Sequence, residues 1–153
     1  MSVYLVSESR VIDADAQRLF DIVADPAMHP RIDGSGSVRE LLDGAPPRLA
    51  LGSKFGMDMK IGAPYKIVNT VVEFDEGHRL AWRHFNGHIW RYIFEPVDGG
   101  TGAPRTKVTE QWDARPAKSR LALVAVGWPI RTRRDIRATL QRLEEFVAAE
   151  PVS

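Results

Sequence analysis

The chain has 153 residues, of which 44% are hydrophobic, and its formal net charge is only +1. This length suits one domain with its own core, and we expect that domain to span residues 1–153. The balanced charge argues against a nucleic-acid partner. The lack of cysteine excludes disulfides, thiolate metal ligands and a cysteine nucleophile.

The amino-terminal segment lacks the basic start and apolar run of a signal peptide. The longest apolar stretch, from Leu121 to Ile130, is too short to cross roughly 30 Å of hydrocarbon as a helix. These features predict a cytoplasmic protein without a membrane span.

In chain order, the first element is a strand at residues 3–12, where β-branched residues alternate loosely with polar ones. A helix follows to about Ala24, with Asp13 as its N-cap. Asp25 and Pro26 end this helix or start a second short one. The opening of the chain therefore predicts a strand followed by one or two short helices.

The middle of the chain is a series of strands. A loop at 34–37, a short strand at 38–42 and a turn at 43–47 precede a clear strand at 51–61. Apolar residues alternate with polar ones along it, which predicts that one set faces the core: Phe55, Met57, Met59 and Ile61. A further strand follows at 65–74.

Residues 79–96 contain an Asn-Gly pair that predicts a hairpin turn. A two-residue turn would mix aromatic and charged side chains on both faces. A three-residue turn with Gly87 in the left-handed region pairs Trp82 with Trp90, and it keeps Arg83 and Arg91 off the aromatic face. Burying either arginine unpaired would cost several kcal/mol. The second register is therefore predicted, with one face formed by Leu80, Trp82, His84, His88, Trp90, Tyr92 and Phe94.

The end of the chain is a glycine-rich turn at 98–102, a last strand at 106–112 and a long helix at 117–149. Val108 and Trp112 alternate on the inner face of that strand, so Glu110 between them points inward too. Gly127 to Pro129 should kink or split the helix. Its apolar stripe consists of Ile136, Leu140, Leu143 and Val147.

Strands that follow one another predict an antiparallel sheet, and a long helix must pack on one face of it. The fold class is therefore α+β, with about six to seven strands. The inner face carries an aromatic and methionine wall with two polar groups: Phe55, Met57, Met59, Trp82, His84, Trp90, Tyr92, Glu110 and Trp112. Such a wall suits a ligand cavity, although a solid core remains the alternative.

Five stretches carry a resemblance that covers nearly the whole chain: SRVIDADAQRLFDIVADPAMHP, LGSKF, VVEFDEGHRLAWR, YIFEPVDGGT and TLQRLEEFV. The chain resembles the START-like, helix-grip (SRPBCC) superfamily, and within it the polyketide cyclase/dehydrase group. The resemblance implies a curved sheet wrapped around the C-terminal helix, with a cavity between them for a small apolar or amphipathic molecule. It implies no cofactor and transfers no catalytic residue.

Glu110 and His84 are the weak catalytic candidates, since a buried carboxyl or imidazole can act as a general acid or base. The structural alternative is a buried pair or a hydrogen bond to ligand. His84 and His88 could meet across the hairpin, but a third metal ligand is not evident, so no metal is predicted. His88 and His29 are expected to contact solvent, and Trp128 to pack at the helix kink and line the cavity.

The basic run from Arg131 to Arg137 is expected to be a solvated helix face, because acidic residues follow it and no aromatics are interleaved. Three functions remain open. The preferred one is a binding protein for a small hydrophobic, aromatic or lipid-like molecule, as a monomer or homodimer. The others are a cyclase or dehydratase that uses Glu110 or His84, and an interaction module with a collapsed cavity.

Overall fold

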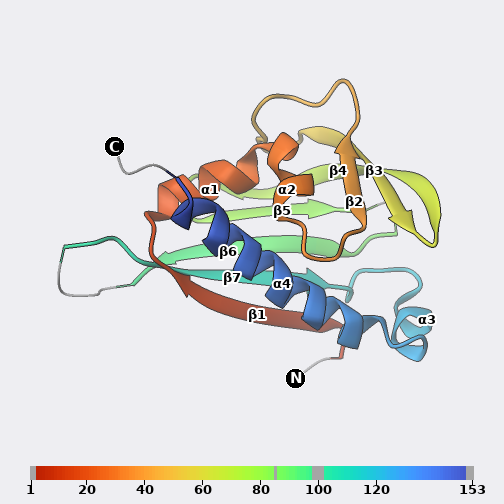
Figure 1. Ribbon diagram of the computed structural model, residues 1–153. Coiled ribbons are helices and arrows are strands. Elements are labelled where there is room, and N and C mark those ends of the chain that lie inside the picture. The colour runs from red at the N-terminus through yellow and green to blue at the C-terminus, as the bar shows by residue number, and fades with distance from the viewer. Residues whose placement is uncertain (1–2, 85, 98–101, 151–153) are drawn as a thin grey trace.

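The computed structural model describes residues 3–84, 86–97 and 102–150 (Figure 1). Its elements confirm the predicted order of one strand, short helices, six strands and a closing long helix. Most of the predicted turn at 98–102 lies outside the described residues. The elements are β1 (Leu5–Ile12), α1 (Ala16–Ala24), a 3-10 turn (Pro26–Met28), α2 (His29–Ile32), β2 (Val38–Leu41), β3 (Lys54–Ile61), β4 (Ala63–Asp75), β5 (Arg79–Arg83), β6 (Ile89–Pro96), β7 (Thr106–Asp113), α3 (Arg120–Ala125) and α4 (Trp128–Ala148).

The strands form one antiparallel sheet in the order β1-β7-β6-β5-β4-β3-β2. Strands β2 to β7 are neighbours in sequence order, and β1 joins the sheet by pairing with β7. The sheet curves, and α4 runs diagonally across its inner face (Figure 1). This arrangement confirms the predicted helix-grip fold.

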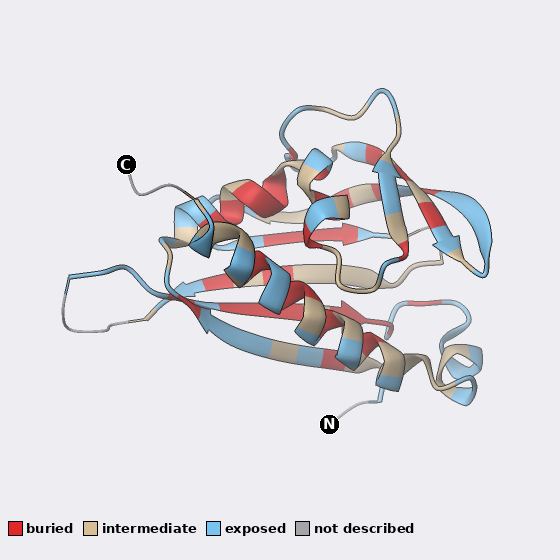
Figure 2. Cartoon of the chain, in the orientation of Figure 1, coloured by how far each residue is buried: buried red, intermediate tan, exposed pale blue. Residues whose placement is uncertain are grey.

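The helices cover different parts of the inner face. Helix α4 packs on β1 and β7, α1 packs on β5 and β6, and α2 packs on β2 and α4. The buried residues of α4 face the sheet while its exposed residues face outward (Figure 2). Between the parts of the inner face that α1 and α4 cover, α2, α4 and the inner face of β3 to β6 enclose a further region. This region contains the cavity described below.

The hairpin of β5 and β6 has the predicted three-residue turn. Trp82 pairs with Trp90, and the backbone N–H of His84 donates to the carbonyl of His88 at 3.0 Å. Gly87 has a φ of 97°, which a residue with a Cβ adopts only under strain. The predicted register is therefore confirmed, and the aromatic residues of both strands share the inner face.

The predicted inner faces of β3 and β7 are also confirmed. Phe55, Met57 and Met59 are buried, as are Val108, Glu110 and Trp112. On the opposite face of the sheet, Arg91 donates to Glu73 at 2.6 Å and to Asp113 at 3.4 Å. These ion pairs explain how the sheet tolerates a partly buried arginine on its outer side.

The start of α1 corrects the predicted cap. Asp15, not Asp13, is the N-cap, and its side chain accepts a hydrogen bond from the N–H of Gln17 at 3.2 Å. Asp13 instead forms an ion pair with Arg105 at 3.1 Å. The chain bends at Asp13 and Ala14, where the N–H of Ala14 donates to the carbonyl of Ile12 at 2.9 Å, so the helix begins later than the sequence pattern indicates.

The long helix is split where glycine and proline predict it. Gly127, with a φ of 75°, separates α3 from α4, and Pro129 occupies the first turn of α4. The predicted helical start at 117 is wrong, because Ala117 belongs to a turn closed by its N–H to the carbonyl of Ala114. The apolar stripe of α4 is buried at Ile136, Leu140 and Leu143, and Val147 is only partly buried.

The loop between α2 and β2 is fastened directly to α4. The N–H of Gly34 donates to the hydroxyl oxygen of Thr139 at 2.8 Å. A Cβ at Gly34 would lie 2.4 Å from the backbone nitrogen of Thr139, so only glycine permits this approach. The loop and helix therefore form one continuous wall.

Across the described residues, no helix combines the length and apolar character needed to span a bilayer.

Candidate functional site

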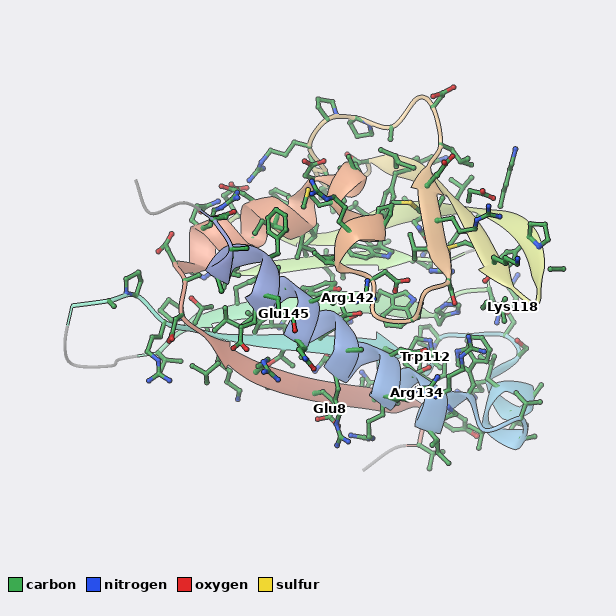
Figure 3. The ribbon with its side chains drawn as sticks, viewed as in Figure 1. Glu8, Trp112, Lys118, Arg134, Arg142 and Glu145 are labelled. Atoms are coloured by element: carbon green, nitrogen blue, oxygen red, sulfur yellow. The ribbon has the colours of Figure 1, made fainter. Side chains whose placement is uncertain are left out.

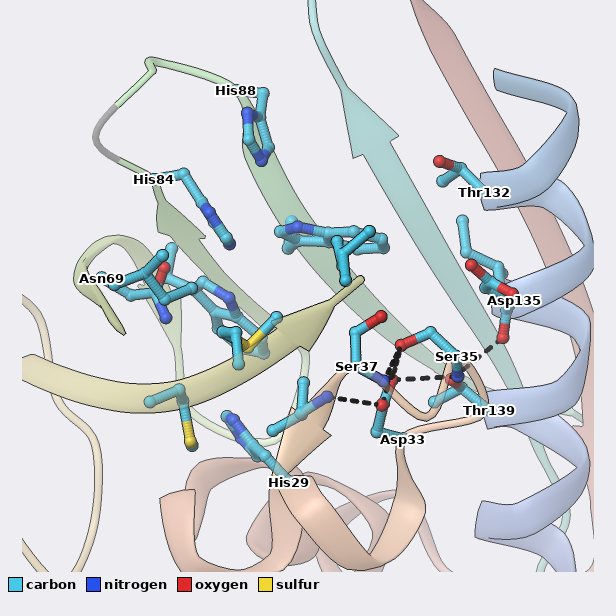
Figure 4. Close-up of a pocket in the computed structure, with 18 of the residues that line it drawn as sticks. His29, Asp33, Ser35, Ser37, Asn69, His84, His88, Thr132, Asp135 and Thr139 are labelled. Atoms are coloured by element: carbon cyan, nitrogen blue, oxygen red, sulfur yellow. Dashed lines mark hydrogen bonds between the residues drawn. The ribbon is translucent and has the colours of Figure 1, made fainter. Parts of the chain in front are cut away.

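A cavity of about 290 Å³ lies between the inner face of the sheet and α4. Its lining combines an apolar wall with polar groups at two ends (Figure 4). The apolar lining consists of Ile32, Val38, Met57, Met59, Ile61, Tyr65, Ile67, Trp82, Trp90, Leu123, Trp128 and Ile136. The polar lining consists of His29, Asp33, Ser35, Ser37, Asn69, His84, Asn86, His88, Tyr92, Glu110, Arg131, Thr132, Asp135 and Thr139.

Trp82 is the centre of the aromatic wall. Its ring stacks on His29 with centroids 4.8 Å apart, meets Phe55 edge-on at 5.5 Å and lies 5.7 Å from Tyr92. Trp82 is only 8% exposed, so the rings hold one another in fixed orientations. The wall therefore presents a largely preformed aromatic surface to the cavity.

Two residues predicted to contact ligand lie behind the lining. Phe55 supports His29 and Trp82 from below, and Trp112 is fully buried with its ring 6.0 Å from His88. Neither residue belongs to the cavity lining. The other predicted residues line the cavity: Met57, Met59, Trp82, His84, Trp90, Tyr92, Glu110 and Trp128. Their contact with a ligand remains a prediction.

His29 is a lining residue that the sequence analysis assigned to solvent. It is 8% exposed, and its Nε2 lies 2.7 Å from the carbonyl oxygen of Val23. Burial lowers the pKa of His29. The sequence signal was two successive helix starts, Asp25-Pro26 and His29-Pro30, which bend the chain back onto the sheet.

The hairpin end of the cavity contains two stacked histidines. The rings of His84 and His88 have centroids 4.3 Å apart, as the bulged turn predicts (Figure 4). Burial lowers the pKa of His84 to about 3, with a contribution from His88, and lowers the pKa of His88 to about 4. His88 is partly buried, so it is less exposed than a histidine in an open turn. Both imidazoles are therefore neutral hydrogen-bonding groups at pH 7.

The metal-binding potential of this pair is small. Within the described part of the chain, no group of three His, Cys, Asp or Glu side chains is placed to hold a metal ion. His84 and His88 supply only two nitrogens, and a zinc site needs three or four protein ligands. The pair is better suited to contact a polar atom of an organic ligand.

Glu110 lies on the inner face of β7, opposite Tyr92 of β6. It is 3% exposed, and burial raises its pKa well above the usual range, with further contributions from Asp33 and Asp135. A hydrogen bond from the Tyr92 hydroxyl opposes this rise. The Glu110 Oε2 atom has no hydrogen-bond partner among the described residues. Burial therefore favours the protonated form of this carboxyl.

The opposite end of the cavity consists of the Asp33–Ser37 loop and one face of α4 (Figure 4). Asp33 accepts hydrogen bonds from the Ser35 hydroxyl at 2.8 Å and from the N–H of Val38 at 3.0 Å. Burial raises the pKa of Asp135, while Arg134 and Arg131 oppose the rise. The sequence analysis did not predict these cavity acids.

A signal for the α4 part of this polar end was present in the sequence. Thr132, Asp135 and Thr139 recur at spacings of three and four, on the same face as Ile136. A helix that lines a cavity is expected to carry polar residues on the same face as its apolar stripe. The loop contribution could not be found this way, since it depends on how the loop folds onto the helix.

The basic run on α4 is only partly the solvated face that was expected. Arg133 and Arg137 form ion pairs with Glu8 of β1 at 2.5 Å and 3.0 Å. Arg131 lines the cavity, 3.6 Å from Asp135. Arg134 projects outward, with 77% of its side chain exposed (Figure 3). The run therefore divides between the sheet, the cavity and solvent.

A curved antiparallel sheet, a long helix across it and a cavity between them define a helix-grip protein. The comparison with protein families agrees. A family model described as "Polyketide cyclase / dehydrase and lipid transport" matches residues 5–147. The chain belongs to this family, as the sequence resemblance predicted.

Relatives extend this result without adding an activity. The chain is 37% identical over 148 residues to "Uncharacterized protein Rv0088" of Mycobacterium tuberculosis, covering 94% of this chain and 64% of that protein. The chain therefore spans only about two thirds of the length of this curated relative.

Solved structures support the fold alone, because their sequence identities are low. Protein Ms6760 from Mycobacterium smegmatis has a TM-score of 0.69 at 18% identity, covering 96% of this chain and 92% of that one. Norcoclaurine synthase from Thalictrum flavum, solved with dopamine and hydroxybenzaldehyde, has a TM-score of 0.64 at 14% identity, covering 97% and 88%.

Proposed function

We propose that this protein binds a small, mainly apolar ring compound in the cavity between the sheet and α4. The observation that carries the proposal is the cavity itself, of about 290 Å³, with its wall of aromatic and methionine side chains. An apolar cavity of roughly 150 Å³ accommodates benzene, so this space suits a compound of about two rings. The volume is also near the lower end of the range for small-molecule sites, about 300–1,000 Å³.

The open cavity favours ligand binding over the interaction module with a collapsed cavity. Trp82 and Trp90 turn toward the cavity and not toward solvent, and stacking with His29 holds Trp82 in place. A fixed apolar wall with a few polar groups is the usual composition of a small-molecule site. The family description, which includes lipid transport, and the small aromatic compounds bound to norcoclaurine synthase support the same ligand class.

A cavity-filling substitution tests the proposal against a matched control. Ile67 lines the cavity, while its neighbour Val68 is 56% exposed on the other face of β4. We expect naphthalenemethanol to bind the wild type with one site per chain and to raise its Tm. Val68→Trp should retain this binding and Ile67→Trp should lose it.

The readouts of this experiment are calorimetric titration and thermal unfolding, with circular dichroism to confirm that both variants fold. If Ile67→Trp does not fold, Ile67→Phe replaces it. Equal binding by the cavity and surface variants would contradict the proposal, as would no binding to the wild type.

An enzyme is the second candidate, and the burial of Glu110 beside Tyr92, which raises the pKa of Glu110, is the observation that favours it. A buried acid of this kind could protonate a departing hydroxyl group in a dehydratase, and the carboxylate left behind could accept the α-proton of the substrate, so that water is lost and Glu110 regains its proton. We expect a β-hydroxy aryl ketone to lose water in the presence of the wild type, measured by the absorbance of the conjugated product. Glu110→Gln should still bind but not react, and equal rates would remove Glu110 from this role.

Assembly and location are further proposals. The balanced charge and the lack of cysteine suit a cytoplasmic monomer or homodimer. Light scattering coupled to size-exclusion chromatography tests the assembly, because an oligomer larger than a dimer would contradict the proposal. Cell fractionation tests the location, since recovery outside the cytoplasm would overturn it.

A further inference from the structure

The polar end of the cavity next to α4 is acidic. Asp33, Glu110 and Asp135 all line it, and they come from three separate parts of the fold: the loop after α2, strand β7 and helix α4. Asp33 and Asp135 both act on Glu110, so the three carboxyls are close enough to influence one another. We call these three residues the acidic end of the cavity.

Glu110 supplies an observation independent of this clustering. Its side chain is 97% buried, and its Oε2 atom lacks a hydrogen-bond partner in the described part of the chain. Leaving a buried polar atom unpaired is costly, so an unpaired atom in a cavity wall points to a partner that the protein itself does not supply. The amide oxygen of Asn69, on the lining of the same cavity, is likewise buried without a partner. A hydrogen-bond donor on the ligand would satisfy either oxygen.

The groups that face Glu110 from the surrounding elements are mostly acidic or neutral. Tyr92 of β6 donates a hydrogen bond to it, and Asp33 and Asp135 raise its pKa. Glu8 of β1 is its direct cross-strand neighbour. The charge of Glu8 is balanced by the two α4 arginines that form ion pairs with it, Arg133 and Arg137.

The cations and histidines of the cavity do not cancel the negative electrostatic potential of the acidic end. Arg131 and Arg134 both pair with Asp135, at 3.6 Å and 3.5 Å, and the Arg131 guanidinium lies 5.2 Å from the ring centre of Trp128. Burial keeps His84 and His88 neutral by lowering their pKa values. A ligand anion could pair with Arg131 only in competition with Asp135, so the acidic end favours a positively charged group.

We propose that the ligand is a ring-bearing amine, whose protonated nitrogen donates a hydrogen bond to Glu110 and whose ring lies on the aromatic and methionine wall. This inference rests on the proposed binding function and specifies its ligand class. Asp33 and Asp135 line the same end of the cavity and favour the positive charge there. Fatty acids and other carboxylates are excluded as preferred ligands by the same field.

Binding of such a cation changes the protonation of Glu110. A positive charge beside a carboxyl favours its ionised form, so the ligand lowers the pKa that burial has raised. The carboxyl proton then leaves for solvent as the amine takes its place. Binding of the amine is therefore coupled to proton release, whereas binding of a neutral alcohol is not.

The test uses three probes with the same ring system: naphthalenemethylamine, naphthalenemethanol and naphthoate. In calorimetric titrations of the whole chain near neutral pH, we expect the amine to bind about tenfold more tightly than the alcohol, since charge-assisted hydrogen bonds are about twice as strong as neutral ones. Naphthoate should bind more weakly than the alcohol. Glu110→Gln should reduce the preference for the amine to within about threefold.

Titrations in buffers of different ionisation enthalpy measure the proton. The wild type should release a proton with the amine and none with the alcohol, and Glu110→Gln should release none with either. Asp135→Asn, which removes a second carboxyl of the acidic end, should also weaken the preference and decides the question if Glu110→Gln does not fold. Glu144→Gln removes an acid that pairs with Arg10 outside the cavity lining, and it should leave the preference intact.

The outcomes separate this inference from the proposed function. Alcohol binding that equals or exceeds amine binding overturns the amine assignment alone, as does a preference that survives Glu110→Gln with the fold intact. Tighter binding of naphthoate overturns it in favour of a carboxylate held by Arg131. If none of the three probes binds, the proposed function fails together with this inference.

Discussion

A carboxyl group on the inner face of β7 must lose its water before the helix can close over the sheet. Glu110 does so with one hydrogen bond from Tyr92 and with two acids nearby, so burial raises its pKa. Folding therefore favours the protonated form of Glu110 over the ionised form. The unfolded chain, in contrast, releases this proton near pH 4.5.

This difference predicts a pH-dependent effect of Glu110→Gln. Above pH 4.5 the unfolded wild type ionises while the folded form retains its proton, so the wild type loses stability as the pH rises. The variant has no such loss. Its free energy of unfolding relative to the wild type should increase by up to about 1.4 kcal/mol per pH unit. Urea denaturation at several pH values measures the difference, and a value independent of pH would contradict the account.

The stacked histidines predict the opposite dependence. Their pKa values fall from 6.5 in the unfolded chain to about 3 for His84 and about 4 for His88. The unfolded chain therefore binds protons first as the pH drops below 6.5, and stability is lost between that value and about 4.

His88→Asn should remove part of this acid sensitivity, on the order of 1–2 kcal/mol by about pH 4. Chemical denaturation at successive pH values provides the measurement. The exposed His78→Asn is the control and should keep the dependence of the wild type. The same slope in all three proteins would show that the stacked pair does not contribute.

At the scale of the elements, turns and register followed from the sequence, but the contact between loop and helix did not. Gly87 is the left-handed residue that the hairpin predicted, and Gly127 lies where the helix was predicted to kink or split, because local pattern determines hairpin turns and helix ends. Gly34 stands in a loop whose sequence signals only flexibility. Its role appears when Thr139, far along the chain, is brought against it.

Gly34→Ala should therefore cost about 1–3 kcal/mol of stability, because a Cβ meets the backbone of α4 and neither element can move easily. Gly62→Ala is the comparison, since Gly62 has a φ of 73° and open space around it. That variant should lose only about 1 kcal/mol, from backbone strain. Thermal unfolding ranks the two, and a Gly34→Ala variant as stable as the wild type would contradict the close contact.

At the scale of the whole molecule, the sequence could predict the sheet, its inner face and the helix across it. Alternation placed Met57, Trp90 and Glu110 on the inner side, since strand periodicity reports one face directly. It could not predict that Trp112 would be fully buried behind the lining while Glu110 on the same strand reaches the cavity. The position of the helix decides which part of the inner face is covered by the helix and which part lines the cavity.

The molecule also has apolar side chains at its surface near the cavity. Leu121 of α3, Val126 at its C-cap and Ile130 in the first turn of α4 are 73%, 74% and 80% exposed, and we call these three residues the α3 patch. A ring compound could associate with this patch instead of entering the molecule, and bulk binding data alone would not distinguish the two places. The location of a bound probe is therefore the decisive observation.

Isotope-filtered NOE spectroscopy with bound naphthalenemethanol locates the probe directly. We predict contacts from its ring protons to the methyl groups of Met57, Met59 and Ile136, which line the cavity from the sheet and from α4. Contacts confined to the methyl groups of the exposed α3 patch would contradict binding between the sheet and the helix.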